Sequence, residues 1–257
     1  MNRTKNIHKD FKASEAFFDD IILNYDSKGE PFGNQDRNSL KLFDLNGKTV
    51  NVKSFRIPNV INQIAYRFFR KSKAQRSFEY GNWLKSLDIG TPQPLAYYEF
   101  KTAFLFKKSY YISEQQDCDL TYRELTTNFN YPDFEAILRA FTRFTYKLHQ
   151  KKVHFLDHSP GNTLIQKVDN GYEFYLVDLN RMEFKELDFE TRIKNFSKLT
   201  IHKFMIEIMS DEYAKCSGEA YDKILDLMWS STEAFQNKYH KKRRLKKKLK
   251  FWKTYQD

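Results

Sequence analysis

Alternating apolar and polar residues predict that the first part of the chain is rich in β-structure. The pair Asn46-Gly47 separates two such runs, which is a strong signal for a two-residue β-hairpin, here over 39–57. The stretch 59–87 has mainly helical spacing instead, and Gly90 is a suitable residue to end that helix. Other apolar runs predict a helix or strand over 13–23 and strands over 95–100, 103–106 and 110–113.

Helical periodicity dominates the second part of the chain. Apolar residues recur at helical spacing from Phe134 to Gln150, which predicts one long amphipathic helix. Further along, two short apolar runs flank Asp169-Asn170-Gly171 and predict a second β-hairpin. Further helices are expected over 188–209 and 217–238.

The segment HFLDHSPGN carries the clearest candidate chemistry. It places Asp157 five residues before Asn162, and the second hairpin then leads from Asn162 to Asp178. Phosphoryl transfer from ATP needs a carboxylate that orients the acceptor hydroxyl, together with an amide oxygen and a second carboxylate that hold Mg²⁺. We therefore assign Asp157 to the hydroxyl, and Asn162 and Asp178 to the metal. A carboxylate at the end of an apolar strand needs a cation or hydrogen-bond donors, which supports the metal role of Asp178.

The first hairpin supplies a candidate residue for the phosphates of the nucleotide. Lys53 lies on its second strand, in KTVNVKSFRI, from which a lysine can reach the α- and β-phosphates of ATP. Glu79, on the following helix, is the expected partner that holds this lysine extended. The alternative is that Lys53 is an exposed lysine of an edge strand.

Together these residues resemble those of the lipopolysaccharide kinase group of the protein-kinase-like superfamily, whose members phosphorylate Kdo or heptose in the inner core. The resemblance covers about residues 40–203, and LKSLDIGTPQPLAYYE is similar to the family's link from its main N-lobe helix into the next strand. The positions that match the family's ATP-binding and catalytic residues are Lys53, Glu79, Asp157, Asn162 and Asp178.

Three differences separate the chain from protein kinases. No arginine precedes Asp157, no glycine follows Asp178-Leu179, and no A-P-E segment closes an activation loop. The first and third differences indicate a kinase without a phosphorylation-controlled activation loop, which suits a small-molecule or glycolipid acceptor.

The resemblance implies an α+β fold of the two-lobed protein-kinase-like type, with a small β-rich N-lobe that contains one main helix and a larger helical C-lobe. The N-lobe would span residues 1–115, the C-lobe 116–237, and a basic amphipathic tail 238–257, in one kinase-like domain. ATP and Mg²⁺ are the implied cofactors. The implied acceptor is Kdo or another inner-core sugar of a lipid A-linked oligosaccharide, at the cytoplasmic face of the bacterial inner membrane.

Other functions stay open at this point. The rival enzymes are a small-molecule phosphotransferase and an atypical Ser/Thr protein kinase. From a different class, a catalytically dead kinase-like scaffold would use its basic tail to bind membrane or RNA. The matching set of five residues argues against such a scaffold.

Two loops have weaker signals. The region SKGEPFGNQDRN contains Gly29 and Gly33 but does not match G-x-G-x-x-G, so it is either a phosphate-covering loop or an ordinary turn. Asp119 lies in SEQQDCDLTYREL, where a kinase chain changes lobes. It is expected either to bind the ribose of the nucleotide or to cap the following helix.

Three more residues near the catalytic segment have candidate roles. We expect His154 to brace the segment and His158 to contact the acceptor sugar. Arg181 would either bind an acceptor phosphate or pair with Glu183 or Glu186.

Composition agrees with one intracellular catalytic domain. At 257 residues the chain is long enough to bury a substantial core, and 17% aromatic residues with only 8 Gly and 6 Pro argue against disorder. The two cysteines, Cys118 and Cys216, lie far apart in the sequence and form no C-x-x-C pair, which argues against structural zinc and a disulfide framework and fits a reducing cytoplasm. Neither an apolar leader nor a membrane-spanning run is evident in the sequence. We expect a monomer.

The net charge of +11 is concentrated at one end of the chain. The segment Lys238–Lys253 holds ten Lys or Arg and no acid, so the rest of the chain has 34 basic and 33 acidic residues. On a helix, Leu245, Leu249 and Trp252 would form an apolar stripe flanked by cations, which is typical of a helix on an anionic membrane. Packing on the domain and nonspecific nucleic-acid binding are the alternatives, and no specific nucleic acid is expected.

A second basic run, RFFRKSKAQR, extends from Arg67 to Arg76. Its two phenylalanines are expected to be core residues. The alternative is that its four basic residues before Arg76 face phosphorylated glycolipid or the bilayer surface.

Overall fold

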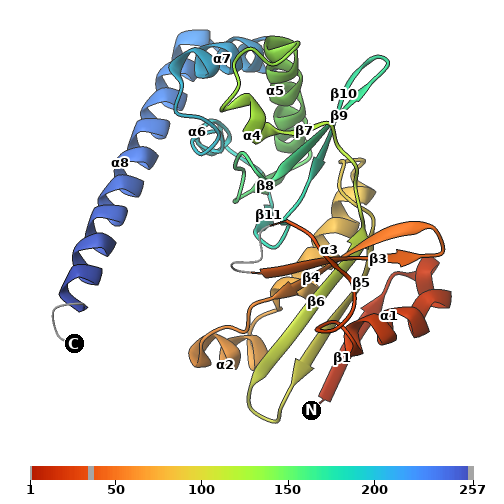
Figure 1. Ribbon diagram of the computed structural model, residues 1–257. Coiled ribbons are helices and arrows are strands. Elements are labelled where there is room, and N and C mark those ends of the chain that lie inside the picture. The colour runs from red at the N-terminus through yellow and green to blue at the C-terminus, as the bar shows by residue number, and fades with distance from the viewer. Residues whose placement is uncertain (1, 34–37, 254–257) are drawn as a thin grey trace. The chain divides into compact units, whose positions relative to one another are not determined.

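A computed structural model describes residues 2–33 and 38–253, with the backbone alone for 248–253. Its contacts divide the chain into two compact units. The first unit comprises Met1–Asp117 and Tyr175–Arg181, and the second comprises Cys118–Phe174 and Met182–Asp257. The first is built on a β-sheet and the second mainly on helices (Figure 1). The molecule is therefore of mixed α/β class, and each unit is described by itself.

The sheet of the first unit has six strands in the order β1-β5-β6-β4-β3-β2, and neighbouring strands run antiparallel. Its strands are β1 (Asn2–Ile7), β2 (Glu30–Pro31), β3 (Asn38–Leu45), β4 (Lys48–Phe55), β5 (Pro94–Lys101) and β6 (Phe106–Glu114). Strand β4 is an interior strand, since it pairs with β3 on one side and β6 on the other.

The predicted hairpin over 39–57 is confirmed as β3–β4. Its turn residues Asn46 and Gly47 have φ angles of 54° and 84°, which is the pair of left-handed conformations that a type I′ turn requires. The carboxylate of Asp44 accepts a hydrogen bond of 3.1 Å from the Gly47 backbone N–H and fixes the turn.

Helices cover the two faces of this sheet. Helix α1 (Glu15–Leu23), which follows the short helix η1 (Lys9–Ser14), packs Phe18 and Ile21 with Val50 and Val52 in one buried cluster. Helix α3 (Lys73–Ser86) packs with Phe55 and other residues of the opposite face in a second cluster. Because side chains alternate along a strand, Lys53 points to the same face as Phe55, toward α3.

The helical stretch predicted over 59–87 is two helices, α2 (Val60–Phe68) and α3. Ser72 separates them, because its hydroxyl accepts a hydrogen bond from the Gln75 backbone N–H and begins α3. The prediction that Gly90 ends this stretch was wrong: Asp88, with φ 54°, is the left-handed residue there, a conformation that Asp adopts more readily than most residues.

The strand predicted over 103–106 was also wrong. Thr102 and Leu105 close a tight turn through hydrogen bonds, and the chain passes from β5 into β6.

The second unit is a helical bundle with short strand pairs. Helix α5 (Phe134–Gln150) has the predicted bounds, and it packs against α7 (Lys203–Ser217), which in turn packs against α8 (Tyr221–Lys253). The buried face of α5, with Ile137, Leu138 and Phe141, lies in the main core of this unit. Helices α4 (Tyr122–Leu125) and α6 (Phe189–Lys194) are short, so the single helix predicted over 188–209 is divided between α6 and α7.

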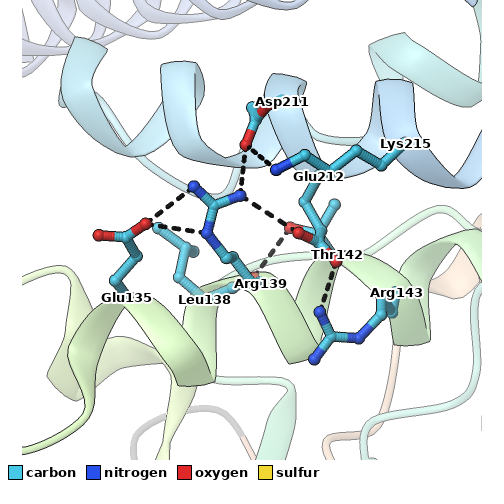
Figure 2. Close-up of polar contacts among 8 residues, drawn as sticks. All are labelled: Glu135, Leu138, Arg139, Thr142, Arg143, Asp211, Glu212 and Lys215. Atoms are coloured by element: carbon cyan, nitrogen blue, oxygen red, sulfur yellow. Dashed lines mark hydrogen bonds and ion pairs between the residues drawn. The ribbon is translucent and has the colours of Figure 1, made fainter.

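A cluster of charged side chains joins α5 to α7 (Figure 2). The Arg139 guanidinium lies 2.5 Å from an Asp211 carboxylate oxygen, 3.2 Å from one of Glu212 and 2.8 Å from one of Glu135. Hydrogen bonding to Asp211, more than any other contact, raises the pKa of Arg139 above its ordinary value. This cluster fixes α5 against α7, and α5 is the helix that leads into the candidate catalytic segment.

Two strand pairs position the candidate catalytic segment, HFLDHSPGN. Strands β9 (Thr163–Val168) and β10 (Gly171–Leu176) form the predicted second hairpin, with β7 (Leu120–Thr121) beside β9. Strand β8 (Val153–Phe155) pairs antiparallel with β11 (Met182–Phe184). The segment from Asp157 to Asn162 therefore lies between the end of β8 and the start of β9.

Helix α8 continues through the predicted boundary at residue 238, and it extends beyond the other helices of its unit (Figure 1). Its residues from Asn237 to Lys247 are exposed, and 54% of Leu245 is accessible to solvent. Leu245 therefore does not pack on the domain, whereas the side chains of Leu249 and Trp252 lie outside the described residues. No helix in the described part of the chain combines the length and apolar character needed to span a bilayer.

Candidate active site

An ion pair between Lys53 and Asp178 forms the centre of the candidate site in the first unit. The Lys53 ammonium donates to an Asp178 carboxylate oxygen over 2.7 Å, and only 15% of the lysine side chain is exposed. The ammonium also lies 5.4 Å from the centre of the Phe55 ring, within range of a cation–π contact. Lys53 is therefore a largely buried residue of an interior strand, and the edge-strand alternative is wrong.

The backbone around Asp178 is shaped to present its carboxylate. Asp178 has a φ of 58°, which places a non-glycine residue in the left-handed region. Asn180 donates from its side-chain amide to the same carboxylate over 2.7 Å. Leu179, between them, is 2% exposed and anchors the segment in the core. A strained residue held by buried neighbours is characteristic of functional sites.

Gly81 allows helix α3 to pack closely against this segment. A Cβ atom at Gly81 would lie 2.6 Å from Pro94 Cγ, 3.2 Å from Leu179 Cδ1 and 3.4 Å from the Tyr111 hydroxyl. Because a proline ring cannot move aside as a flexible side chain does, only glycine fits at this position. The glycine thereby positions α3 beside Asp178.

A second lysine, Lys73, lies within electrostatic range of Asp178. Lys73, at the start of α3, interacts electrostatically with Asp178, Lys53, Arg76 and Arg181. The Lys73 residue as a whole is exposed, but partial burial of its ammonium group is the main cause that lowers its pKa, and the attraction of Asp178 acts in the opposite direction. Lys53 and Lys73 both act on the Asp178 carboxylate, and Arg76 and Arg181 lie within electrostatic range of Lys73. This concentration of cations makes the region suited to bind a polyanion such as a triphosphate.

The expected ion pair between Lys53 and Glu79 is absent from the structure. One Glu79 carboxylate oxygen accepts from the Lys71 ammonium over 2.8 Å, and the other accepts from the Gln75 amide over 3.0 Å. Both partners come from the start of α3 or the residues just before it, so local contacts satisfy Glu79. Lys53 has Asp178 as its partner instead.

In the second unit, the segment from Asp157 to Asn162 is closed by its own hydrogen bonds. The Asn162 side-chain amide donates to the Asp157 carbonyl over 2.8 Å, and the Asn162 backbone N–H donates to the Ser159 carbonyl over 3.0 Å. Asp157 and Asn162 are both half-buried. The structure thus joins the predicted hydroxyl-orienting residue and the predicted metal ligand in one compact loop.

Two polar side chains hold this loop from α6 and the loop that follows it. The Asn195 amide donates to the Phe155 carbonyl over 2.9 Å, and its oxygen lies 3.3 Å from Nε2 of His149 on α5. The Lys198 ammonium donates to the Leu156 carbonyl. The backbone that leads into Asp157 is therefore fixed at two successive carbonyls.

The two histidines of the loop have structural positions. His154 lies 3.3 Å from Glu183 across the β8–β11 pair, as expected for a bracing residue. His158 is fully buried, its ring stacks on Phe141 at 5.3 Å, and burial lowers its pKa to about 3. The prediction that His158 contacts the acceptor sugar was wrong, because a buried neutral ring cannot reach a bound sugar.

Sequence reasoning did not identify Arg123, which lies beside the candidate loop. A Cβ atom at Gly161 would lie 2.7 Å from Arg123 Nη2, so the guanidinium rests against the loop between Asp157 and Asn162. Arg123 is exposed and has no carboxylate partner among residues 2–33 and 38–253. Lys73 and Arg123 were missed for the same reason, since only the fold brings them to the motif residues.

The structure places Asp119 and most of the SKGEPFGNQDRN region, the two loops with weaker sequence signals. The Asp119 carboxylate accepts from the Lys167 backbone N–H over 2.6 Å and links β7 to β9. Thr121 caps α4, so the capping role considered for Asp119 was wrong. Gly29 and Gly33 both have positive φ and flank β2, whereas residues 34–37 of the predicted phosphate-covering region lie outside the described residues.

The two groups of candidate residues belong to different units. Lys53, Lys73 and Asp178 lie in the first unit, and Asp157 and Asn162 lie in the second. In the described part of the chain, no three or more His, Cys, Asp or Glu residues form a metal-binding cluster. The Asn162 amide oxygen and the Asp178 carboxylate are each, in its own unit, an oxygen donor of the kind that Mg²⁺ prefers.

Comparisons with known proteins support the fold. No protein-family model and no curated protein sequence matches this chain. Solved structures do match, and one of them is WaaP in complex with acyl carrier protein. The match has a TM-score of 0.63 and 14% sequence identity, and it covers 93% of this chain and 98% of WaaP. At this identity the likeness shows the fold alone: the chain shares the fold of WaaP over most of the length of both.

Proposed function

We propose that this protein is an ATP- and Mg²⁺-dependent kinase that transfers the γ-phosphoryl group to a sugar hydroxyl of the lipopolysaccharide inner core. The observation that carries the proposal is the Lys53–Asp178 ion pair with Lys73 within electrostatic range of both, on a backbone held in a strained conformation. The kinase-like fold shared with WaaP and the closed Asp157–Asn162 loop are consistent with it.

Each candidate residue has a role in this reaction. Lys53 and Lys73 bind the phosphates of ATP, while Asp178 and Asn162 supply oxygen ligands for Mg²⁺. The metal, when bound, neutralises charge on the phosphates. Asp119 is proposed as a ribose ligand. Glu79 is retained as a partner of Lys53 in the nucleotide-bound protein, although Lys71 and Gln75 bind it in this structure.

Asp157 acts on the acceptor. Its carboxylate orients the sugar hydroxyl and takes the hydroxyl proton as the new oxygen–phosphorus bond forms and the bond to ADP breaks. Arg123, against the same loop, is placed to bind a carboxylate or phosphate of the acceptor, and Kdo carries such a carboxylate. Catalysis rests on positioning and charge, since the protein supplies no covalent intermediate.

The acceptor follows from the sequence resemblance, and a direct measurement tests it. Lipid A-core oligosaccharide incubated with the protein, ATP and Mg²⁺ should gain the mass of one phosphate, and fragmentation should locate it on Kdo or heptose. Phosphate on a small sugar or a peptide alone would favour the other phosphotransferases. Absence of both transfer and nucleotide binding would favour a dead scaffold.

We also propose that the protein acts at the inner face of the bacterial inner membrane, where the exposed basic part of α8 binds anionic lipid. WaaP was solved in complex with acyl carrier protein, so acyl carrier protein is the control partner in any binding test.

A further inference from the structure

Helix α2 has its apolar side exposed to solvent and its polar side turned toward the rest of the first unit, the opposite of most surface helices. Its polar residues face the first unit: Gln63 is 8% exposed and donates to the Pro58 carbonyl over 2.9 Å. The Arg67 Nε group donates to the Thr102 carbonyl over 3.1 Å, and the Tyr66 ring lies 5.6 Å from that of Phe106. These contacts fix the orientation of the helix, so its outward face is a defined surface.

The outward face is apolar. Ile61 is 78% exposed and Phe69, just after the helix, is 81% exposed, with Val60, Ile64 and Phe68 beside them. Phe104, in the β5–β6 turn, is 74% exposed, and the Arg67 hydrogen bond ties this turn to α2. We call these six residues the α2 surface. The expectation that Phe68 and Phe69 are core residues is therefore wrong.

Cations border the α2 surface. The stretch from Arg56 to Ser77 contains six Lys or Arg residues and no Asp or Glu. Among the described residues, no carboxylate forms an ion pair with Arg56, Arg67 or Arg70. The Arg67 guanidinium lies 5.1 Å from the Phe68 ring centre, so charge and apolar surface are adjacent. Exposed aliphatic and aromatic side chains bordered by arginines whose charge no carboxylate of the described residues neutralises match an anionic membrane interface. There, apolar groups enter the acyl region and arginines meet lipid phosphates.

We propose that the α2 surface is a membrane-docking site that inserts into an anionic lipid leaflet, with Arg56, Arg67 and Arg70 at the phosphate level. This site is distinct from the basic part of α8 and lies on the first unit. It is independent of the proposed function, because membrane docking needs neither ATP nor an acceptor.

Vesicle binding by the full chain tests the proposal. The probe is vesicles of phosphatidylcholine with and without phosphatidylglycerol, in a sedimentation assay at low and high salt. The variant Ile61→Gln with Phe69→Gln should bind anionic vesicles roughly tenfold or more weakly than the unmodified protein, and the loss should persist at high salt because it is apolar. The matched control is Leu23→Gln with Ile201→Gln, two exposed apolar residues outside the α2 surface, and it should bind normally.

Insertion can be measured directly. A tryptophan introduced as Phe69→Trp should be quenched by brominated lipid, whereas Leu23→Trp should not. Unchanged vesicle binding by the double variant, or no added quenching at position 69, would overturn the proposal. It would also be wrong if the double variant kept vesicle binding but lost binding to acyl carrier protein or self-association, since the surface would then be a protein interface. Circular dichroism confirms that each variant is folded.

Discussion

Asp178 combines charge, hydrogen bonding and backbone strain at one residue. Its left-handed conformation costs about 1–3 kcal/mol for a residue other than glycine. Hydrogen bonds from Lys53 and Asn180 to its carboxylate, and the burial of Leu179, keep it in place. We infer that the strain is retained because it directs the carboxylate toward the Lys53 ammonium.

Substitution of Asp157 and substitution of Asp178 should impair different steps of the reaction. Asp157→Asn should lower phosphate transfer by about 10²-fold or more and leave nucleotide affinity nearly unchanged, because this residue acts on the acceptor. Asp178→Asn should instead lose Mg²⁺-dependent nucleotide binding, because it removes a metal ligand. Calorimetry with an ATP analogue and a transfer assay separate the two effects. The control is Asp88→Asn, at an exposed position that also has positive φ, which should keep normal turnover. Normal turnover by both Asp157→Asn and Asp178→Asn would exclude the kinase assignment.

Lys53 and Asp178 should be energetically coupled in the nucleotide-free protein. A double-mutant cycle of Lys53→Met and Asp178→Asn on the free energy of unfolding should show a coupling of about 0.5–3 kcal/mol, because the two side chains are in contact. The same cycle with Glu79→Gln in place of Asp178→Asn should be additive, since Glu79 binds Lys71 and Gln75. Strong coupling between Lys53 and Glu79 without nucleotide would contradict the ion pairs seen in the structure.

At the scale of elements, Gly81 decides how closely α3 approaches the Asp178 segment. Gly81→Ala should destabilise the protein by about 1–3 kcal/mol, because the new methyl group meets the Pro94 ring. Helix propensity acts in the opposite direction by about 1 kcal/mol, so the steric effect must exceed it. Lys85→Ala, at an exposed position of the same helix, should have little effect in chemical denaturation. A stabilised Gly81→Ala variant would show that α3 does not pack as closely as described.

Periodic elements were predictable from the sequence, and contacts between them were not. Helix α5 has the predicted bounds because its apolar residues follow one helical face without interruption. The β3–β4 hairpin was predictable because Asn46-Gly47 determines its turn type. The exact ends of helices were harder to predict, because more than one nearby residue can adopt the left-handed conformation that ends a helix. After α3 that residue is Asp88 rather than Gly90. The partner of Lys53 could not be predicted, because Glu79 and Asp178 are both reasonable on chemical grounds and only packing selects between them.

At the scale of the whole molecule, two buried histidines should control stability in acid. Burial lowers the pKa of His149 to about 4 and that of His158 to about 3, from an ordinary value of 6.5. The unfolded chain therefore binds more protons than the folded protein below about pH 6.5, so stability is complete above that pH and falls as the pH drops toward 3. The expected loss is about 1.4 kcal/mol per pH unit for each histidine. In urea unfolding between pH 4 and 6.5, His158→Gln should flatten this dependence. The control His240→Gln, at an exposed position, should leave the pH dependence unchanged. An equal pH dependence of unfolding in the unmodified protein and both variants would show that His158 does not control stability in acid.

The exposed basic end of α8 should bind anionic membranes separately from catalysis. Deleting residues 238–257 should weaken vesicle binding strongly, since each cation near an anionic surface contributes about 1 kcal/mol that salt screens. Turnover on a soluble sugar fragment should change little. Trp252→Ala should reduce only the part of binding that resists salt. Full-strength vesicle binding by the deletion variant would assign membrane association to another surface, such as the α2 surface.

The Lys53–Asp178 ion pair has a consequence for how ligands enter. In the protein without nucleotide, each group already holds a counter-ion of opposite sign. A polyphosphate that bound alone would pair with the Lys53 ammonium and leave the Asp178 carboxylate without its counter-ion. A divalent cation that bound alone would pair with Asp178 and leave Lys53 without its counter-ion. Only the two together compensate both lost contacts, so each should raise the affinity for the other. We therefore expect the nucleotide-free protein to have low affinity for free polyphosphate and for the free metal ion, and higher affinity for the complex of the two.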